Sequence, residues 1–412
     1  MDNHVLNTHD KTLLRDLAKR VTEIASLPIM DKRRDYWFRH NRLERVQPMV
    51  LIFPEGSWSE LLPDSILQCQ NLQARKFEWE LRSRIYCYEN FRDDTVIEKT
   101  WIVNRRIVDS GWGVQPRHID RTTPTGSWKF DPVIKEPSHL KLLQFPEVTY
   151  DPIGTESDLI QAQELFNDIL DVKLKGVRHI SFHLMQLYTD LRGLEEAFQD
   201  MIERPQMVHD AMTFLEEGHR HLVQQYIDLN LLSLNNDQTY HSSGGVGYST
   251  ELPKPDYDEQ HVRPCDMWSS AESQELHVVS PAMHYEFALQ YEKRLLEPFG
   301  LNGYGCCEDL TKKLDFVFTI PNIRRISISP FANVDKCAER LGSKYIFSWK
   351  PQPAHLVGDF DANRIRQYIQ HTLDVTHNCV IEVILKDTHT CENHPERFTQ
   401  WSEIAYQLAQ EY

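Results

Sequence analysis

The amino-acid sequence predicts an α/β fold, a (β/α)8 TIM barrel with an N-terminal helical and β extension. From about residue 150 onward, short apolar runs alternate with amphipathic segments of helical length, which is typical of parallel βαβ units with right-handed crossovers. Polar, reactive side chains also follow the end of one predicted strand after another. In a barrel these strand ends meet at one face, where the chemistry is located.

The extension is predicted to span residues 1–150, to contribute the first barrel strand and to cover part of the barrel. Residues 11–27 have the apolar spacing of a helix, and the proline-bracketed run 48–54 is typical of a buried strand. Residues 95–107 alternate like an exposed antiparallel strand. The segment 109–151, rich in Pro, Gly and Trp, is predicted as irregular cover.

Residues 151–412 are predicted to form the main part of the barrel. Seven barrel strands are expected, and the eighth is left unplaced within 100–150. The strands after the first are expected near 177–185, 230–237, 303–307, 323–330, 344–351 and 379–387. The helices are expected near 156–170, 193–203, 205–229, 280–299, 333–342, 361–377 and from 395 onward. Residues 242–249, "SSGGVGYS", are predicted as a mobile loop over the barrel mouth, because they lack the context of a nucleotide-binding motif.

Composition excludes several functional classes. The formal charge of -16 argues against sequence-independent binding to nucleic acid or to an anionic membrane. No apolar run is long enough to span a bilayer, and the polar, acidic first residues are not a signal peptide. Eight cysteines without regular spacing are expected to be reduced thiols of a cytoplasmic protein. A small-molecule substrate is therefore expected.

Three cysteines lie among polar neighbours at predicted strand ends. Cys306 and Cys307 belong to "GYGCCEDL", and Cys391 belongs to "DTHTCENHPERF". If both stretches lie at one barrel face, Cys306 and Cys391 can share a zinc ion, which prefers about three N or S ligands in a catalytic site. The alternative is that they are ordinary buried thiols. The third ligand is left open among four residues: Cys307, His389, His394 and Glu308.

Other strand ends carry candidate substrate contacts. His183 and Tyr188 lie near the end of the strand predicted at 177–185, and a lone histidine in such a place is more often structural. Asn235 and Asp237 end the next predicted strand. Asp237 is a candidate general base or positioning acid, and the alternative is that it caps a turn.

The order of motifs over residues 160–412 resembles the uroporphyrinogen decarboxylase superfamily, in particular its zinc- and corrinoid-dependent methyltransferases. The similar segments are "LRGLEEAFQDMIERPQMVHDAMTFL", "SPAMHYEFALQYEKRLLEPF", "GYGCCEDL", "AERLGSKYIFSWKPQP" and "VILKDTHTCENHPERF". Cys306 matches the family's first thiolate ligand and Cys391 the second, whereas Tyr304 replaces its histidine ligand. Trp349 and Lys350 replace a Gly-Asn pair.

The resemblance implies a metal-dependent methyltransferase that moves a methyl group between a small substrate and a corrinoid or thiol. Zinc would be held at the barrel mouth by Cys306 and Cys391, completed by Cys307 or His389, and the corrinoid would be carried by a partner protein. Asp237 and His183 are assigned to catalysis, and substrate binding is assigned to Tyr188, Tyr304, Asn235 and Lys350. A homodimer is the default expectation for this architecture.

Two alternatives stay open beside this reading. One is a lyase of the decarboxylase type that uses Asp237 and no metal, although the arginine motif with which such enzymes grip propionates is not found. The other is a non-catalytic relative that binds a small ligand, which the tyrosine at position 304 favours.

Overall fold

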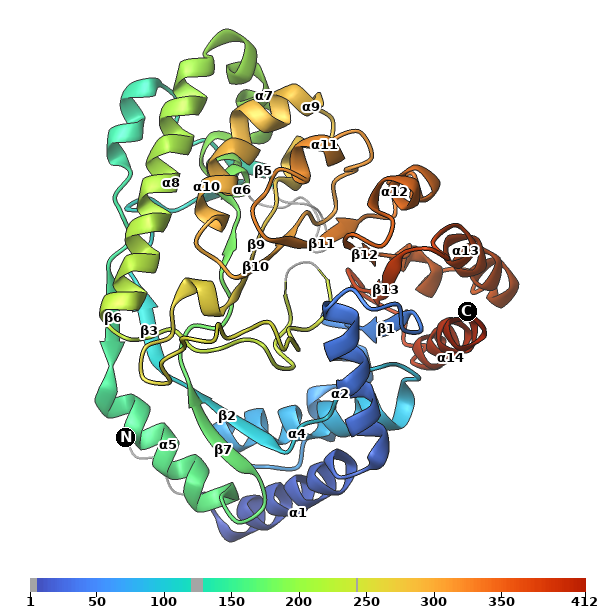
Figure 1. Cartoon of the computed structure of the whole chain (residues 1–412). Helices are drawn as coiled ribbons and strands as arrows, with labels where there is room; N and C mark the ends of the chain where they lie inside the picture. The colour runs from blue at the N-terminus through green and yellow to red at the C-terminus, as the bar shows by residue number, and fades with distance from the viewer. Residues whose placement is uncertain (1–5, 120–128, 242–243) are drawn as a thin grey trace.

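A computed structural model describes residues 6–119, 129–241 and 244–412. Its main sheet has seven strands, all paired in parallel, and they form a curved wall (Figure 1). The predicted α/β class is confirmed, and the arrangement is consistent with a TIM-barrel-like fold. Among the described residues the sheet does not close into a complete barrel. In spatial order the strands are β1 (Met49–Ile52), β13 (Val380–Leu385), β12 (Ile346–Trp349), β11 (Ile323–Ile328), β10 (Leu301–Tyr304), β9 (Trp268–Ala271) and β8 (Ser181–Phe182).

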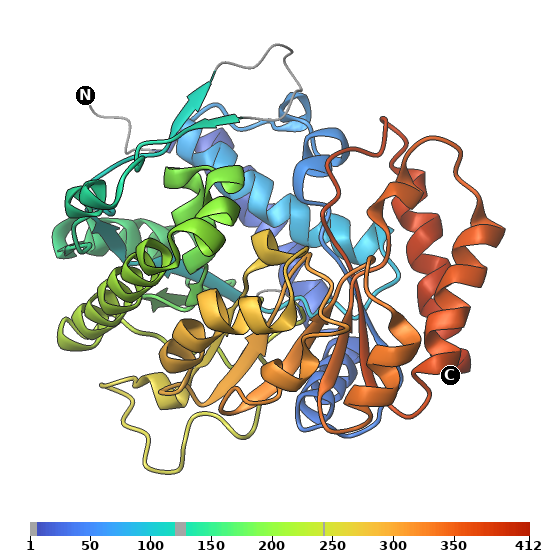
Figure 2. The same ribbon diagram turned by 90° about the horizontal axis from the view of Figure 1, so that it is seen from above.

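Helices cover the outer face of this sheet (Figures 1 and 2). Their buried side chains form one large core with alternate residues of the strands, among them Ile326, Phe347 and Val383. The covering helices are α6 (Leu184–Arg192), α7 (Leu194–Glu203), α8 (Pro205–Asp228), α9 (Pro281–His284), α10 (Gln290–Leu296), α11 (Leu314–Val317), α12 (Val334–Leu341), α13 (Ala362–Val375) and α14 (Glu396–Glu411). A π-helical stretch, Tyr285–Leu289, joins α9 to α10.

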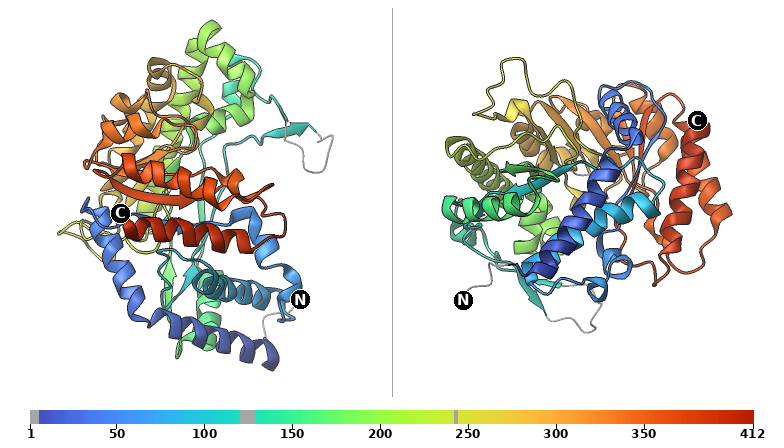
Figure 3. Two further views of the ribbon diagram at one scale, coloured as in Figure 1. Left: turned by 90° about the vertical axis from the view of Figure 1, so that its right-hand side faces the viewer. Right: turned by 90° about the horizontal axis from the view of Figure 1, so that it is seen from below.

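The amino-terminal part has a second core, formed by helices and two paired strands at one end of the molecule (Figure 3). Trp101 and Phe166 lie at its centre, with ring centroids 4.6 Å apart. Its elements are α1 (Thr8–Ala25), α4 (Leu72–Asn90), α5 (Pro152–Phe166), β2 (Thr100–Asn104) and β7 (Asp171–Lys175). Thus α5 and β7, on the barrel side of the predicted boundary at residue 150, pack against the extension.

The smaller elements connect these parts. Helix α2 (Pro28–Asn41) joins the amino-terminal helices to β1, and α3 (Trp58–Leu61) follows β1. The prediction of one antiparallel strand over 95–107 is wrong in part, because β2 pairs in parallel with β7. Only the next strand is antiparallel. Two short antiparallel ribbons complete the fold: β3 (Arg106–Asp109) with β6 (Val148–Asp151), and β4 (Arg117–Ile119) with β5 (Lys129–Asp131).

The sheet has β1 at one edge and β8 at the other, and β1 forms no strand pair with β2, the next strand along the chain, among the described residues. Buried aspartates take the place of a neighbouring strand at the edge of β1. The Val50 N–H donates to the Asp94 carboxylate over 2.8 Å, and Val50 O accepts from the Asp94 N–H over 2.8 Å. Backbone groups of the edge are thereby satisfied without pairing.

Polar side chains line the concave face of the sheet. Arg325 of β11 and Glu382 of β13 are fully buried, and Arg325 Nε lies 2.9 Å from Glu382 Oε1. These strands are not neighbours, so the two side chains meet across the inner face. TIM barrels usually fill this space with branched apolar side chains. The interior here is held by charge and hydrogen bonds.

Residues 244–249, named here the inserted segment, pass through this interior instead of covering the mouth. The Gly245 N–H donates to Glu382 Oε1 over 2.9 Å, and Asn41 Nδ2 donates to Val246 O over 2.9 Å. A Cβ atom on Gly244 would lie 2.3 Å from Arg325 Cδ, which explains the glycine. The prediction of a mobile loop is wrong for residues 244–249, because they are buried and hydrogen-bonded. Residues 242 and 243 of that prediction lie outside the described residues.

Candidate functional site

Two adjacent cysteines lie at the carboxyl end of β10. This strand ends at Tyr304, and Gly305 has a φ of +93°, a conformation that turns the chain out of the strand. Both thiols therefore reach the same side, with Cys306 Sγ 3.6 Å from Cys307 Sγ. The Cys306 N–H donates to Glu308 Oε2 over 2.8 Å, and Cys307 Sγ lies 3.8 Å from Asp387 Oδ2 after β13. We call this region, where β8 to β13 end, the mouth.

A histidine–carboxylate pair lies at the ends of β8 and β9. His183 Nδ1 is 2.5 Å from Glu272 Oε1, and His183 Nε2 is 2.8 Å from Ser181 Oγ. Burial opposes a charge on His183. The hydrogen bond and charge of Glu272 outweigh this effect and raise the pKa of His183 above its ordinary value. The predicted catalytic residue His183 therefore lies at the mouth, oriented by a carboxylate.

Two lysines follow the neighbouring strands β12 and β13. Lys350 is 3% exposed, and its Nζ donates to Ser348 Oγ over 3.0 Å. Burial lowers the pKa of Lys350 to about 7. Burial also disfavours the charge on Lys386, but the charges of Tyr240, Cys306 and Asp387 outweigh it and raise the pKa of Lys386. Lys386 is therefore the permanent cation of the pair.

Cys306 is the point on which these groups converge. A negative charge on Cys306 would raise the pKa of His183 after β8, of Lys350 after β12 and of Lys386 after β13, and also that of the buried Glu308. It also interacts with Tyr240, just before the inserted segment. Nearby cations favour the thiolate form of a cysteine, which is the nucleophilic form.

Two carboxyl groups at the mouth have raised pKa values: the buried Glu308, which accepts from the Cys306 N–H, and the half-buried Glu275. Burial, reinforced by the charge of Glu272, raises the pKa of Glu275 to about 8 and that of Glu308 to about 7. Near neutral pH Glu275 is therefore largely protonated and Glu308 about half protonated. Each can act as a proton donor.

The four predicted metal ligands do not come together at one point in the structure. Cys306 and Cys307 lie at the mouth, whereas the buried Cys391 donates its S–H to Glu60 Oε2 over 3.0 Å. His389 is exposed, with its backbone beside Gly56. Over the described ranges, no three His, Cys, Asp or Glu side chains are placed to hold a metal ion. The arrangement therefore does not fit a zinc ion shared by these residues.

Three predicted substrate contacts have structural partners instead. Tyr304 is buried and hydrogen-bonds Glu292 Oε2 over 2.8 Å, on the side of β10 that faces the helices. Tyr188 donates to Asp200 Oδ2 over 3.2 Å, and Asn235 Oδ1 accepts from the Trp268 N–H over 3.0 Å. All three are buried. Their surroundings give no support to a substrate contact.

Asp237 caps a turn, the alternative that the sequence left open. It accepts from the Thr239 N–H over 2.9 Å and lies 3.8 Å from Lys175 Nζ. Its part in catalysis stays a prediction. Of the residues assigned from the sequence, the mouth brings together His183, Lys350, Cys306 and Cys307.

Sequence reasoning missed Glu272, Glu275, Lys386 and Tyr240. Lys386 could have been predicted, because it directly follows an apolar run that was correctly predicted as a strand. Glu272 follows β9, "WSSA", which is too short and too rich in serine to be recognised as a strand.

Comparison with known proteins finds a distant likeness in structure. No protein-family model matches the chain, and no curated protein matches it. Among solved structures, a methyltransferase from Methanosarcina mazei is similar at a TM-score of 0.47 and 10% sequence identity, over 89% of this chain and 97% of that one. Such a distant likeness carries no conclusion about activity. No helix within the described ranges is long and apolar enough to cross a membrane.

Replacing Glu272 with glutamine is expected to lower the pKa of His183 by about one to two units, because burial then acts without an opposing negative charge. Titration of the histidine ring protons by NMR measures this change. Ser270→Ala is the control, since Ser270 contacts Ser181 and leaves the ion pair intact. An unchanged titration midpoint in the Glu272→Gln variant would show that the pair does not hold the proton.

Proposed function

We propose that this chain is a group-transfer enzyme of the methyltransferase type, in which the Cys306 thiolate moves a methyl group to or from a small substrate. The observation that carries this proposal is the convergence of His183, Lys386 and other groups from separate strand ends on one thiol. Packing alone does not require a buried cation and a histidine pair around a cysteine, whereas a nucleophilic thiol does.

In the proposed step, the thiolate sulfur attacks the methyl carbon of the donor. The sulfur electron pair forms the new S–C bond, and the bond between the methyl group and its leaving atom breaks, with the leaving atom keeping that pair. Lys386 supplies positive charge beside the thiolate. The hydrogen bond with Cys306, followed by burial, raises the pKa of Cys307, so Cys307 keeps its proton and donates it toward the Cys306 sulfur. When the methyl group instead comes from the small substrate, we assign to His183 the protonation of the leaving heteroatom.

The methyl donor follows from the family resemblance. A corrinoid carried by a separate protein is the donor that we propose, and methylcobalamin is the matching probe. The resemblance also implies zinc, but the predicted ligands do not fit one zinc ion in this arrangement. The step above therefore involves no metal ion.

A decarboxylase-type lyase is the second candidate, and the protonated carboxyl groups favour it. Glu275 and Glu308 lie beside the mouth as acids at neutral pH. Such acids suit the protonation of a carbanion left by loss of carbon dioxide. In this version the proton donor is one of these glutamates, and Cys306 takes no part.

Methylation of the purified protein tests the proposal. The full chain is incubated with methylcobalamin, and each cysteine-containing peptide is followed by mass spectrometry. We expect Cys306 to gain a methyl group first and the Cys306→Ser variant to lose this reaction. Cys265→Ser is the matched control, because Cys265 lies in the turn Pro264–Asp266, away from the mouth residues named above.

Three outcomes would overturn the proposal. Absence of methylation at Cys306 is the first. Loss of the reaction in Cys391→Ser, together with zinc in the purified protein, would replace it with the metal-dependent version. Loss of substrate turnover in Glu308→Gln but not in Cys306→Ser would favour the lyase.

A further inference from the structure

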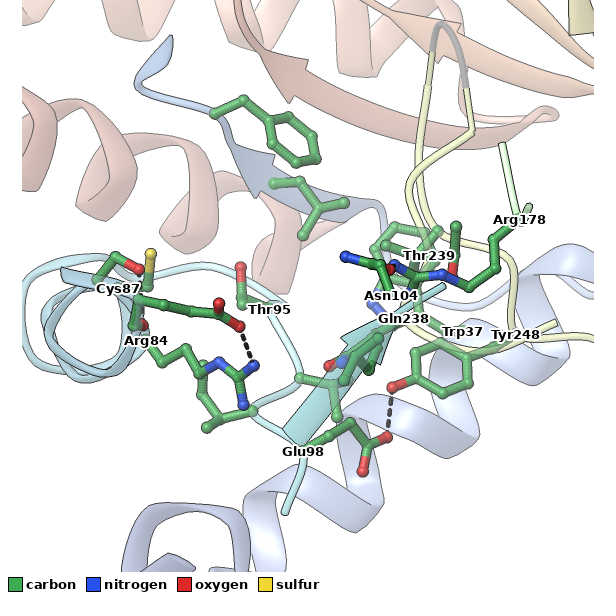
Figure 4. A pocket seen from close by; sticks show the side chains of 18 residues that line it. Trp37, Arg84, Cys87, Thr95, Glu98, Asn104, Arg178, Gln238, Thr239 and Tyr248 are labelled. Carbon is green, nitrogen blue, oxygen red and sulfur yellow. Dashed lines mark hydrogen bonds and ion pairs between the residues drawn. The ribbon is translucent and has the colours of Figure 1, made fainter. Parts of the chain in front are cut away.

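A cavity of about 490 Å³ lies between the edge strand β1 and strand β2, outside the cluster around Cys306. Figure 4 shows the cavity, with side chains from α2, α4, β1, β2 and the inserted segment around it. In a closed barrel, strand pairing would occupy this place. Its volume lies within the range of about 300–1,000 Å³ that is usual for small-molecule sites.

The inner walls of the cavity are apolar and partly aromatic. They are formed by Trp37, Leu51, Phe53, Val96, Ile102 and Val246. Such walls favour a flat aromatic body, because burial of apolar surface is favourable and aromatic rings stack on or against one another.

Three of the four charged side chains that line the cavity are neutralised by ion pairs. Glu80 pairs with Arg84. Glu98 accepts from Arg34 over 3.0 Å and from the Tyr248 hydroxyl over 2.5 Å. These ion pairs leave little uncompensated charge on this part of the cavity wall.

Arg178 is the exception. Its guanidinium donates only to Asn104 Oδ1, over 3.3 Å, and no carboxylate of the described residues lies within salt-bridge distance of it. The carboxamides of Asn104 and Gln238 lie beside it in Figure 4. A guanidinium with amide donors beside it matches a carboxylate. A single uncompensated cation suits one negative charge, and a polyphosphate would need several.

We infer that this cavity binds a small monocarboxylic acid with a flat apolar body, its carboxylate at Arg178 and its body against the half-buried side chains of Phe53 and Ile102. The site lies next to the mouth, because the Phe53 ring centroid is 5.0 Å from that of Tyr240. It does not depend on the chemistry proposed for Cys306, so either proposal stands if the other fails.

Isothermal titration calorimetry with two probes tests the inference. The probes are 2-naphthoate and its neutral match, 2-naphthamide, each titrated into the full chain. We expect 2-naphthoate to bind one molecule per chain, and 2-naphthamide to bind about tenfold to a hundredfold more weakly. The Arg178→Gln variant should weaken 2-naphthoate by a similar factor and leave 2-naphthamide unchanged.

Two further variants locate the binding. Leu51→Trp fills the cavity and should abolish binding of both probes. Arg366→Gln removes an arginine from the exposed face of α13 and should change neither affinity. Arg178 is only half-buried, so its replacement does not put folding at risk. Failure of 2-naphthoate to bind, equal affinity for both probes, or undiminished binding in Arg178→Gln would overturn the inference.

Discussion

The Arg325→Met variant is expected to lose about 3–5 kcal/mol of the free energy of unfolding, because it leaves the buried Glu382 carboxylate without its cation. Glu382 is 0% exposed. Arg325 Nη2 also donates to Asn41 Oδ1 over 2.8 Å, so its loss affects the contacts of α2 and of the inserted segment together. Urea unfolding at pH 7 measures the effect.

The loss should depend on pH with a definite sign. Burial opposes the charge on Glu382, but Arg325 and His40 outweigh it and hold the pKa of Glu382 well below its ordinary value of 4.5. In the wild type, this stability is present above pH 4.5 and is lost as pH falls below it. Without Arg325, burial raises the pKa of Glu382 above 4.5. The variant therefore loses stability as the pH increases from 4.5 toward this raised pKa. The difference between the proteins should therefore be smaller at pH 5 than at pH 7.

Arg324→Met is the control for this prediction. Arg324 is the preceding residue of β11, but its carboxylate partner Glu251 is 39% exposed. Its loss should cost no more than about 2 kcal/mol. Equal losses in the two variants would show that burial of the pair contributes nothing. In the double variant Arg325→Met, Glu382→Leu, part of the stability should return, since no unpaired charge is left.

The Lys386→Met variant is expected to slow alkylation of Cys306 at pH 7 by about tenfold, because it removes the permanent cation beside the thiolate. Reaction with iodoacetamide, followed at the Cys306–Cys307 peptide by mass spectrometry, gives the rate at each pH. The midpoint of the pH–rate profile should move upward by about one unit.

Lys344→Met serves as the control for the alkylation experiment. Lys344 is exposed at the turn before β12, so its removal should leave the rate unchanged. If Lys386→Met also left both the rate and the midpoint unchanged, the cation would not stabilise the thiolate, and the proposed role of Cys306 would lose its main electrostatic support.

Most apolar strands were predictable from the sequence, and the polar one was not. The strand predicted near 230–237 is wrong, because among the described residues this stretch forms only an isolated bridge between Leu232 and Val177. β1, β12 and β13 coincide with largely apolar runs bounded by proline or polar residues, and β11 coincides with the predicted segment 323–330, in which polar and apolar residues are mixed. Ser280 accepts from the Met283 N–H at the start of α9, the cap that its position before Pro281 favours. β9 was missed because its inward residue Ser270 faces a polar interior, so it shows no alternation of apolar and polar side chains.

A site at the strand ends was predictable from the sequence, but the full set of residues that form it was not. Reactive residues at strand ends indicate that carboxyl ends converge, and His183, Lys350, Cys306 and Cys307 do so. Cys391 does not join them, because Glu60, a residue 331 positions earlier in the chain, receives its S–H. Such a pairing depends on the path of the loop after β13 and leaves no signal in local spacing.

The buried polar contacts on the concave face of the sheet also constrain how the chain folds. Glu382 draws its partners from positions separated from it by 57, 137 and 342 residues: Arg325, Gly245 and His40. A fragment that ends before β13 buries an arginine with no acid, and one that begins after α2 lacks the histidine. Each fragment lacks part of this buried set of contacts, so we expect the two ends of the polypeptide to reach their final positions in a single late event.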